Sequence, residues 1–290
     1  MTIPYFPGCT LSTKGAGFDR SGRAVAEALG MPLEELADWQ CCGATFPLST
    51  ENSMSFIAPT RLLTQAQNAG GHVTTLCAIC FHVLRRSQHF LQNSPEMLER
   101  INLFTEEPYD GQTRVSHFLE LLRDDLGWGE LSKRVTQPLK GIKLAPYYGC
   151  LLLRPYEEVN LDNPDDPRIL HDLLSALGAE VIDFPYRDEC CGSFLAVSKP
   201  EVPKAMAGDI VESARKHGAQ ALVTACPLCQ FNLDYPQRSL AGVRSGRELP
   251  VVYFTQVMAA ALGLPFEDWG MEKHYVDPSP LFQPVQKVQP

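Results

Sequence analysis

The chain has 290 residues, a formal net charge of −9 and a hydrophobic content of 44%. This length accommodates one large domain or two of ordinary size, and the hydrophobic content supplies a core that needs no disulfides to hold it together. Binding to nucleic acid requires a basic face, so the acidic balance disfavours a nucleic-acid partner.

The amino terminus and the hydropathy pattern indicate a soluble protein. The first residues, MTIPYFPGC, contain neither the basic nor the apolar region of a secretory signal. The longest apolar stretch, around residues 257–264, is much shorter than the roughly 20 residues that span a bilayer. We therefore expect a cytoplasmic protein without a transmembrane segment. In a reducing compartment, paired thiols are more often metal ligands or redox centres than structural disulfides.

The first half of the chain is predicted to contain two helices and a strand, and its cysteine motifs lie between and after these elements. Helices are expected over residues 23–30 and 57–68, each closed by glycine. The apolar run 73–76 is typical of a buried strand, and a C-x-x-C motif follows its carboxyl end. Five cysteines lie in this half as a single residue, an adjacent pair before Gly43 and the C-x-x-C motif: Cys9, Cys41, Cys42, Cys77 and Cys80.

The second half repeats this order. Helices are expected over residues 169–178 and 202–217, and a buried strand over residues 221–225. The doublet and the C-x-x-C motif are separated by 34 residues in both halves (77 − 42 − 1 and 226 − 191 − 1). The five cysteines of this half again form a single residue, a doublet before Gly192 and a C-x-x-C motif: Cys150, Cys190, Cys191, Cys226 and Cys229.

The repeat extends beyond the cysteines and predicts the domain organisation. Residues 115–127 match residues 251–263 at a constant offset of 136, and Thr255 is the expected N-cap of a helix in the second copy. Alternating strands and helices predict an α/β fold with short, mostly parallel sheets flanked by helices. We expect two homologous domains related by a pseudo-twofold axis, at residues 1–135 and 136–265, joined near residues 132–143. The proline-rich residues 266–290 are expected to form an extended arm or a disordered tail.

Five thiols in each half narrow the choice of metal. A structural zinc site uses four ligands, commonly two C-x-x-C pairs, and each half has only one such pair. A conventional four-iron cubane would leave one cysteine unused in each half. Zinc and structural disulfides remain alternatives, but an iron–sulfur cluster whose fifth thiol bridges irons or completes an unusual cluster fits best.

The doublets need a bend in the backbone before both of their thiols can reach one cluster. Adjacent side chains of an extended chain point to opposite sides. Gly43 and Gly192 follow the doublets and can adopt the positive φ that such a bend requires. Each C-x-x-C motif opens a helix, whose free N–H groups favour the negative charge of a cluster.

Taken with the segments Tyr5-Phe6-Pro7-Gly8-Cys9 and Tyr147-Tyr148-Gly149-Cys150, this double pattern resembles the cysteine-rich CCG domain family. It is most similar to the B subunit of heterodisulfide reductase, over residues 3 to about 265. The resemblance implies one noncubane [4Fe-4S] cluster in each CCG domain, the two facing each other across a substrate cleft. It implies that each five-cysteine set holds one cluster, the first by Cys9, Cys41, Cys42, Cys77 and Cys80, the second by Cys150, Cys190, Cys191, Cys226 and Cys229.

The resemblance also implies an enzymatic role and partner proteins. The chain would be the catalytic component of a disulfide reductase, in which each cluster supplies one electron to a disulfide substrate. The sequence has no C-x2-C-x2-C-x3-C run and no G-x-G-x-x-G turn, so this chain is expected to bind no flavin or nicotinamide. Electrons would come from two further proteins of the complex, one like the small C subunit, which carries cubane iron–sulfur clusters, and one like the flavin-containing A subunit.

Other polar residues near the cysteine motifs are weaker candidates for a functional role. His82, just past the first C-x-x-C motif, is a candidate proton donor, and Asn232 lies near the matching place in the second half. Asp38 and Asp188 precede the doublets, where a turn or cap hydrogen bond is the expected role.

Two other functions remain open from the sequence. One is an electron-transfer component of another CCG-containing oxidoreductase that acts on lactate, glycolate, succinate or sulfur compounds. The other is a zinc-stabilised scaffold. The sequence does not mark the residues of a substrate cleft, so the disulfide or sulfur substrate is left open.

Overall fold

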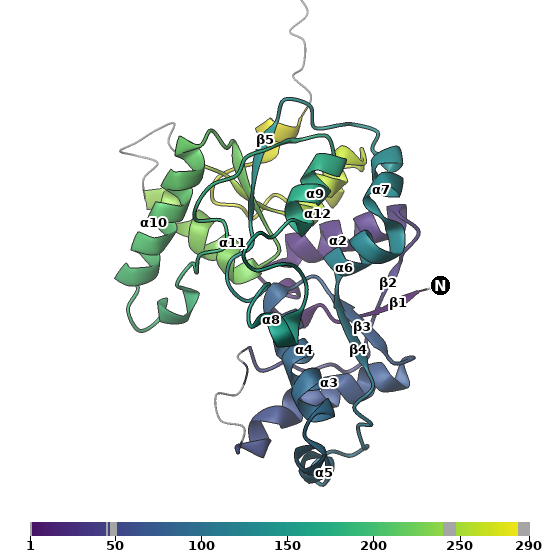
Figure 1. Cartoon of the computed structure of the whole chain (residues 1–290). Coiled ribbons are helices and arrows are strands. Elements are labelled where there is room, and N and C mark those ends of the chain that lie inside the picture. Colours follow the sequence, from purple (N-terminus) through teal and green to yellow (C-terminus); the bar gives the residue numbers. More distant parts are fainter. Residues whose placement is uncertain (1, 45, 47–50, 240–247, 284–290) are drawn as a thin grey trace, which may run out of the picture.

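Two parallel four-stranded sheets organise the protein, seen in a computed structural model that describes residues 2–44, 46, 51–239 and 248–283 (Figure 1). The first sheet has the order β2-β1-β3-β4 and the second the matching order β6-β5-β7-β8. The strands are β1 (Ile3–Tyr5), β2 (Leu33–Glu35), β3 (His72–Thr75), β4 (Arg114–His117), β5 (Lys143–Tyr147), β6 (Glu180–Val181), β7 (Ala221–Thr224) and β8 (Val251–Tyr253). The expected α/β fold with parallel pairing is confirmed.

Helices flank both sheets, and the predicted helices are present. Those of the first half are α1 (Gly8–Leu11), α2 (Ala16–Ala28), α3 (Ile57–Asn68), α4 (Ala78–Gln92), α5 (Pro95–Asn102), α6 (Phe118–Glu120) and α7 (Trp128–Arg134), with the π-helical turn η2 (Leu121–Leu126). Those of the second half are α8 (Tyr156–Val159), α9 (Ile169–Ala176), α10 (Glu201–Lys216), α11 (Pro227–Asp234), α12 (Phe254–Ala261) and α13 (Ser279–Phe282). Four short 3₁₀ turns complete the described elements: η1 (Ser53–Phe56), η3 (Ser193–Leu195), η4 (Tyr235–Ser239) and η5 (Phe266–Asp268). None of these helices combines the length and the apolar character needed to cross a membrane.

The strand order creates the same topological feature in both sheets. From β1 the chain passes through α2 to β2 on one side, and then through α3 to β3 on the other side of β1. The second sheet repeats this path, so β5 lies between β6 and β7. Open parallel sheets bind ligands outside the carboxyl ends of their strands at such a reversal. The reversal points here are the β1–β3 and β5–β7 pairs.

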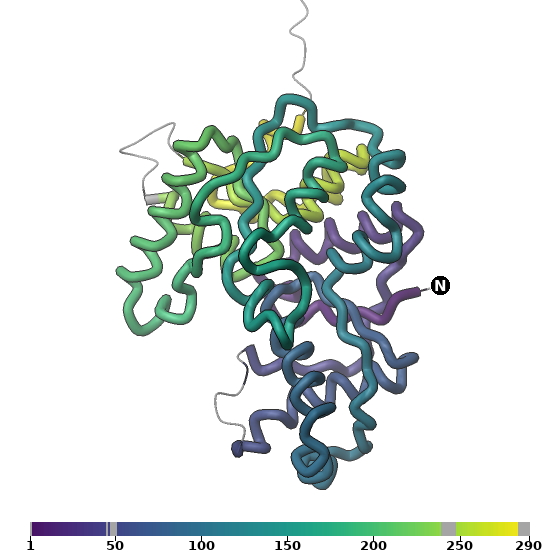
Figure 2. Tube along the Cα trace, in the orientation of Figure 1, coloured from purple at the N-terminus to yellow at the C-terminus, as the bar shows by residue number. Residues whose placement is uncertain are grey.

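The two halves share one hydrophobic core. Helix α2 of the first half packs against α12 of the second (Figures 1 and 2). The Phe18 ring stacks on Tyr253 with centroids 4.1 Å apart. The buried Ser21 and Thr255 hydroxyl oxygens are 2.7 Å apart across the same contact. Burial of this contact makes the two sheets a single packed unit. Domain boundaries near residues 135 and 265 stay a prediction.

The expectation that Thr255 caps a helix is wrong. Helix α12 begins two residues earlier than expected, at Phe254, with Tyr253 as its N-cap. The side-chain oxygen of Gln256 accepts the Tyr253 N–H at 2.9 Å and so closes the first turn. Because the Thr255 hydroxyl is engaged with Ser21 of the other half, it does not cap its own helix.

The carboxyl-terminal segment is ordered through residue 283, so disorder is the wrong expectation for residues 266–283. Trp269 and Met271 are buried in the common core. A Cβ placed on Gly17 would lie 2.0 Å from the Gly270 carbonyl oxygen, so this segment passes directly over α2. Burial, rather than local composition, orders these residues. Residues 284–290 lie outside the described part.

Asp234 fastens this segment to α11, which predicts the effect of replacing it. Its fully buried carboxylate accepts the Tyr275 N–H at 2.8 Å and the Val276 N–H at 3.0 Å. Asp234→Asn removes one acceptor and is expected to lower the free energy of unfolding by about 1–3 kcal/mol. Hydrogen exchange at residues 270–276 should accelerate. Asp277→Asn, at an exposed residue whose carboxylate accepts the Ser279 N–H, is the control. Unchanged hydrogen exchange at residues 270–276 in the Asp234 variant would show that this carboxylate does not hold the segment in place.

Candidate metal centres

The cysteines gather at the two reversal points of the sheets. Cys9 follows β1 and lies in α1, while Cys77 follows β3 and forms the N-cap of α4. In the second half, Cys150 follows β5, and Cys226 follows β7 as the N-cap of α11. Because β1 pairs with β3, and β5 with β7, each isolated cysteine is brought beside the C-x-x-C motif of its own half.

In the first half the doublet joins the isolated cysteine to the C-x-x-C motif. The Cys41 sulfur lies 3.8 Å from that of Cys9, and the Cys42 sulfur lies 3.7 Å from that of Cys80. The two doublet thiols thus reach two different partners around one site. Cys42 and Cys80 are buried, whereas Cys9 and Cys41 are exposed.

The second half reproduces this arrangement closely. The Cys190 sulfur lies 3.8 Å from that of Cys150, and the Cys191 sulfur lies 3.6 Å from that of Cys229. The Cys229 N–H points at the Cys226 sulfur at 3.4 Å, as expected at a helix N-terminus. The structure therefore brings the ten sequence-predicted cysteines into two matching groups of five.

The expected bend at each doublet is present. Gly43 has φ 97° and Gly192 has φ 74°, both in the region that favours glycine. Each glycine directs its N–H back to the first sulfur of its doublet, at 3.5 Å to Cys41 and 3.3 Å to Cys190. The bend thus turns both thiols inward and supplies a hydrogen-bond donor to one of them.

The donor set fits an iron–sulfur group. Each site offers five soft thiol donors, which suit iron–sulfur clusters. Hydrogen bonding with Cys80 lowers the pKa of Cys42 to about 7, and the Cys229 thiol lowers the pKa of Cys191 to about 7 in the same way. Thiolates are the form that binds metal. Among the described residues, no three His, Cys, Asp or Glu side chains are arranged closely enough to hold a single metal ion. The assignment of the ten cysteines as ligands stays a prediction.

Two glycines that the sequence reasoning did not assign a role also shape the sites. Gly8 and Gly149 directly precede the isolated cysteines and have φ values of 75° and 63°. A Cβ on Gly8 would lie 2.6 Å from the Cys80 sulfur, and one on Gly149 would lie 3.2 Å from the Cys229 sulfur. The sequence contained a signal for this role, because a glycine directly precedes the isolated cysteine in both halves. The absence of a side chain at this glycine leaves room for the sulfur of the second cysteine in the C-x-x-C motif.

This geometry predicts a graded loss of iron when these glycines are replaced. Gly8→Ala should deplete the first site, and Gly149→Ala should deplete the second less severely, because its contact is longer. Gly141→Ala is the matched control, since Gly141 has φ 79° but nothing within 4 Å of an added Cβ. It carries only the backbone strain of about 1–2 kcal/mol. Iron analysis of anaerobically purified variants checks the order. Equal iron in all three variants would mean that the sulfur contacts are irrelevant.

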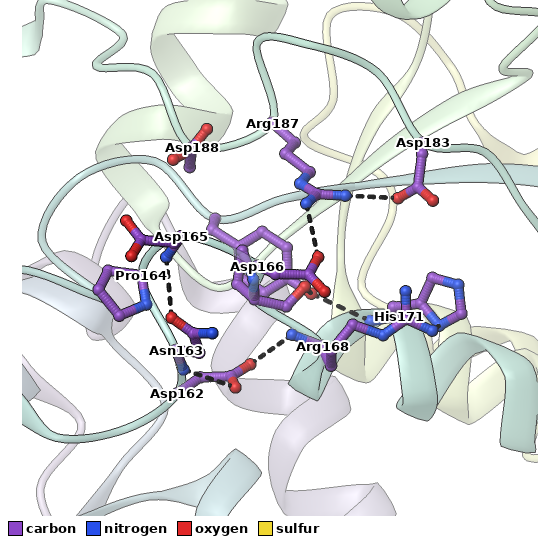
Figure 3. Close-up of polar contacts among 12 residues, drawn as sticks. Asp162, Asn163, Pro164, Asp165, Asp166, Arg168, His171, Asp183, Arg187 and Asp188 are labelled. Atoms are coloured by element: carbon purple, nitrogen blue, oxygen red, sulfur yellow. Dashed lines mark hydrogen bonds and ion pairs between the residues drawn. The ribbon is translucent and has the colours of Figure 1, made fainter.

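A polar loop, residues 162–168, is held in place by hydrogen bonds and ion pairs (Figure 3). The Asp162 carboxylate accepts the N–H groups of Arg168 and Ile169, both at 2.6 Å, and so fixes the start of α9. Tyr148, two residues before Cys150, donates its hydroxyl hydrogen to the Pro167 carbonyl at 2.9 Å. The turn that carries Cys150 is thereby tied to this loop.

Arginines connect the same loop to the second doublet. Arg187 reaches both Asp183 and Asp166 at 2.8 Å, as the dashed lines of Figure 3 show. Arg154 binds the Asp188 carboxylate at 2.8 Å, just before the doublet. Asp188 is therefore held by an ion pair rather than by the expected turn bond, while Asp38 adopts φ 51° in its turn.

His82 lies at a contact between the halves. Its Nδ1 is 3.1 Å from the Leu151 carbonyl oxygen, and its Nε2 is 3.4 Å from an Arg86 nitrogen. Burial and the neighbouring Arg86 charge lower the pKa of His82 to about 4. A proton-donor role stays a prediction. The C-x-x-C motifs are offset by 149 (229 − 80), so the equivalent residue is Phe231. Asn232 instead donates to the Cys191 carbonyl at 2.6 Å.

Comparison with known proteins gives the family. The cysteine-rich domain named CCG matches twice, at residues 3–85 and 144–234. The 8-methylmenaquinol:fumarate reductase membrane anchor subunit of Wolinella succinogenes is 31% identical, covering 96% of this chain and 98% of that protein. The B subunit of the ferredoxin/F(420)H(2)-dependent CoB-CoM heterodisulfide reductase of Methanosarcina acetivorans is 26% identical, covering 94% of this chain and 93% of its own.

A solved structure shares the fold. The crystal structure of a hypothetical protein from Helicobacter pylori superposes with a TM-score of 0.74 at 13% identity over 94% of this chain. This chain spans 51% of that longer protein. Two copies of one domain model and a relative at 31% identity over nearly the full length lead to one conclusion: this chain belongs to the cysteine-rich CCG domain family.

Proposed function

We propose that this chain is the catalytic iron–sulfur component of a heterodisulfide reductase-like complex. In it, a disulfide substrate is reduced to two thiols with electrons from partner proteins. Relatives named as subunits of heterodisulfide and fumarate reductases support an iron–sulfur oxidoreductase component that works within a complex. We infer one noncubane [4Fe-4S] cluster for each half, and the five-thiol sets and the family resemblance support this type and number.

The observation that carries the proposal is the closeness of the two cysteine sites. The Ala78 N–H, inside the first C-x-x-C motif, donates to the Ala225 carbonyl directly before the second motif at 3.1 Å. Tyr253 lies near cysteines of both sites. Burial is the main cause of its raised pKa, and the charges of Cys226 and Cys77 both add to the rise. Two redox sites this close can serve one substrate.

The chemistry needs two electrons and two protons for each disulfide, R–S–S–R′ + 2e⁻ + 2H⁺ → RSH + R′SH. Bound clusters would supply single electrons. The chain's own residues supply the thiol ligands, hold the two sites in contact and exclude water. Ala78 and Ile79 of the first half, with Leu152 of the second, wall the space beside Cys150 and Cys191.

The test is disulfide reduction by the anaerobically purified holoprotein with an artificial one-electron donor, such as reduced methyl viologen. The proposal expects one disulfide consumed and two thiols released for every two donor molecules oxidised. A holoprotein with intact clusters that oxidises no donor in the presence of aromatic and aliphatic disulfides would contradict it.

One relative favours a second candidate. The Wolinella protein is named for a fumarate reductase, so this chain could instead relay electrons within an oxidoreductase that acts on another substrate. A relay needs its clusters to accept and donate electrons but requires no disulfide bond at the site. Rapid electron exchange with a partner, combined with no disulfide reduction, would favour this alternative.

A further inference from the structure

Tyr253 lies where the side chains of the pseudo-twofold repeat differ. The offset of 136 between the halves makes His117 its equivalent, and both residues are buried N-caps of the helix that follows the last strand of their sheet. Both nitrogens of the His117 ring are engaged, since Nε2 donates to the Leu76 carbonyl at 2.9 Å and Nδ1 accepts the Leu119 N–H at 3.2 Å. The second half therefore has a phenol where the first half has a fully hydrogen-bonded imidazole.

The Tyr253 ring lies between the two halves, beside elements that carry cysteines of both sites. In the second sheet, Tyr253 pairs with Thr224, two residues before Cys226. Its ring stacks on Phe18 of the first half with the planes 2° from parallel. It also borders a cavity whose wall includes Thr10, the residue after the isolated cysteine of the first half. This position is at the carboxyl ends of the strands, where open parallel sheets place their functional groups.

Gln230 is the hydrogen-bond partner of this phenol, and its own neighbours fix its orientation. Its Nε2 faces the Asp234 carboxylate at 2.9 Å, the Val251 carbonyl at 3.2 Å and the Nδ1 atom of His274 at 3.1 Å. Burial lowers the pKa of His274 to about 4, so the ring is neutral. Its Nε2 donates to the Gln256 side-chain oxygen at 3.0 Å, which leaves Nδ1 as an acceptor. Oε1 of Gln230 therefore faces the phenol and can only accept.

The hydrogen bond that Tyr253 donates to this amide oxygen is long. The two oxygen atoms are 3.4 Å apart, whereas about 2.7–2.8 Å is usual for an O–H···O bond. Tyr147, beside the second site, donates at 2.7 Å to the Glu189 carbonyl. Tyr5, beside the first, donates at 2.7 Å to the Asp19 carboxylate. Burial raises the pKa of Tyr253 well above its usual value, so its hydroxyl keeps its hydrogen and can rotate toward a stronger acceptor.

We propose that Tyr253 is a hydrogen-bond donor shared by the two metal centres, its hydroxyl turning from Gln230 toward sulfur when a centre gains an electron. Reduction adds negative charge, which makes the sulfur atoms of a centre better acceptors. Hydrogen bonds to these sulfurs stabilise the reduced form and so raise its reduction potential. This inference rests on the proposed iron–sulfur clusters but not on disulfide reduction.

Tyr253→Phe tests the proposal, because it removes the hydroxyl and keeps the ring that stacks on Phe18. In redox titrations of the anaerobically purified holoprotein, followed by electron paramagnetic resonance, the equilibrium constant for one-electron reduction should fall about tenfold at both centres. Cys42→Ser and Cys191→Ser, each expected to keep one centre, assign the signals. In D₂O, electron–nuclear double resonance of the reduced wild-type centres should show an exchangeable deuteron that Tyr253→Phe lacks.

Two further tyrosine variants are controls, and a third variant works in the opposite direction. Tyr147→Phe should affect the second centre alone, because the cysteines near this phenol all belong to the second site. Tyr109→Phe, at a buried tyrosine in the loop before β4, should change neither centre. Gln230→Met removes the competing acceptor and should raise both equilibrium constants. Iron content shows whether each variant has kept its centres.

Each outcome bears on the proposal. Unchanged equilibrium constants in Tyr253→Phe, or a change at only one centre, would overturn the shared donor. An exchangeable deuteron signal that survives in this variant would do the same, as would lowered constants in Gln230→Met. If the constants change as expected but the holoprotein reduces no disulfide, the proposed function fails and this inference stands. A wild-type chain that holds no iron–sulfur cluster would overturn both.

Discussion

Replacing one doublet cysteine in either half, by Cys42→Ser or by Cys191→Ser, will lower disulfide reduction by about a hundredfold or more instead of halving it, as expected for groups that act as a unit. The doublet sulfurs lie 3.7 and 3.6 Å from the last cysteine of their own sets, so each substitution disrupts only its own site. Removing either site leaves a one-electron centre facing a two-electron bond. Turnover with an artificial donor that reaches both sites is the measurement.

Iron content provides the control for this experiment. Each variant should retain roughly half of the iron, because the two cysteine sets belong to different sheets and metal binding stabilises each site locally. Near-normal turnover in either variant would rule out the paired-site mechanism and favour an electron relay. Loss of all the iron from both variants would instead show that the two sites do not assemble separately.

The isolated chain will reduce disulfides with NADH or NADPH at least on the order of a hundredfold more slowly than when a reduced cubane iron–sulfur partner is present. The ten cysteines are all accounted for by the two sites, and the sequence has no G-x-G-x-x-G turn for a nicotinamide or flavin cofactor. The proposed function therefore expects electrons to enter through another protein. Stopped-flow absorption of the chain, with and without the partner, measures this difference.

A chain without metal is the control for non-specific thiol exchange, since its free cysteines can attack a disulfide once without turnover. Rapid, catalytic consumption of NADPH by the isolated holoprotein would contradict the requirement for a partner. A partner that lacks its own clusters should give no stimulation.

Local sequence patterns predicted much of the fold because they depend on nearby residues. The helix expected at residues 57–68 is α3 with the same limits, and the strand expected at residues 73–76 is β3, shifted by one residue. The repeated cysteine spacing predicted two sites, and the shared strand order places both at equivalent points.

Long-range contacts account for what the sequence did not reveal. Threonine is common at helix N-caps, but the Thr255 hydroxyl is hydrogen-bonded to Ser21, which lies 234 residues away in the sequence. Proline content suggested an arm or a disordered tail, yet Asp234 and Gly17 fix residues 266–283 in place.

The central claim is that each half holds an iron–sulfur cluster in its five-cysteine site. Metal and acid-labile sulfide analysis of the anaerobically purified wild-type chain tests it most directly, together with absorption and electron paramagnetic resonance spectra. The account predicts a brown protein with about eight iron and eight sulfide per chain, as two four-iron clusters require. A colourless protein with stoichiometric zinc and no sulfide, after anaerobic reconstitution with iron and sulfide, would contradict it.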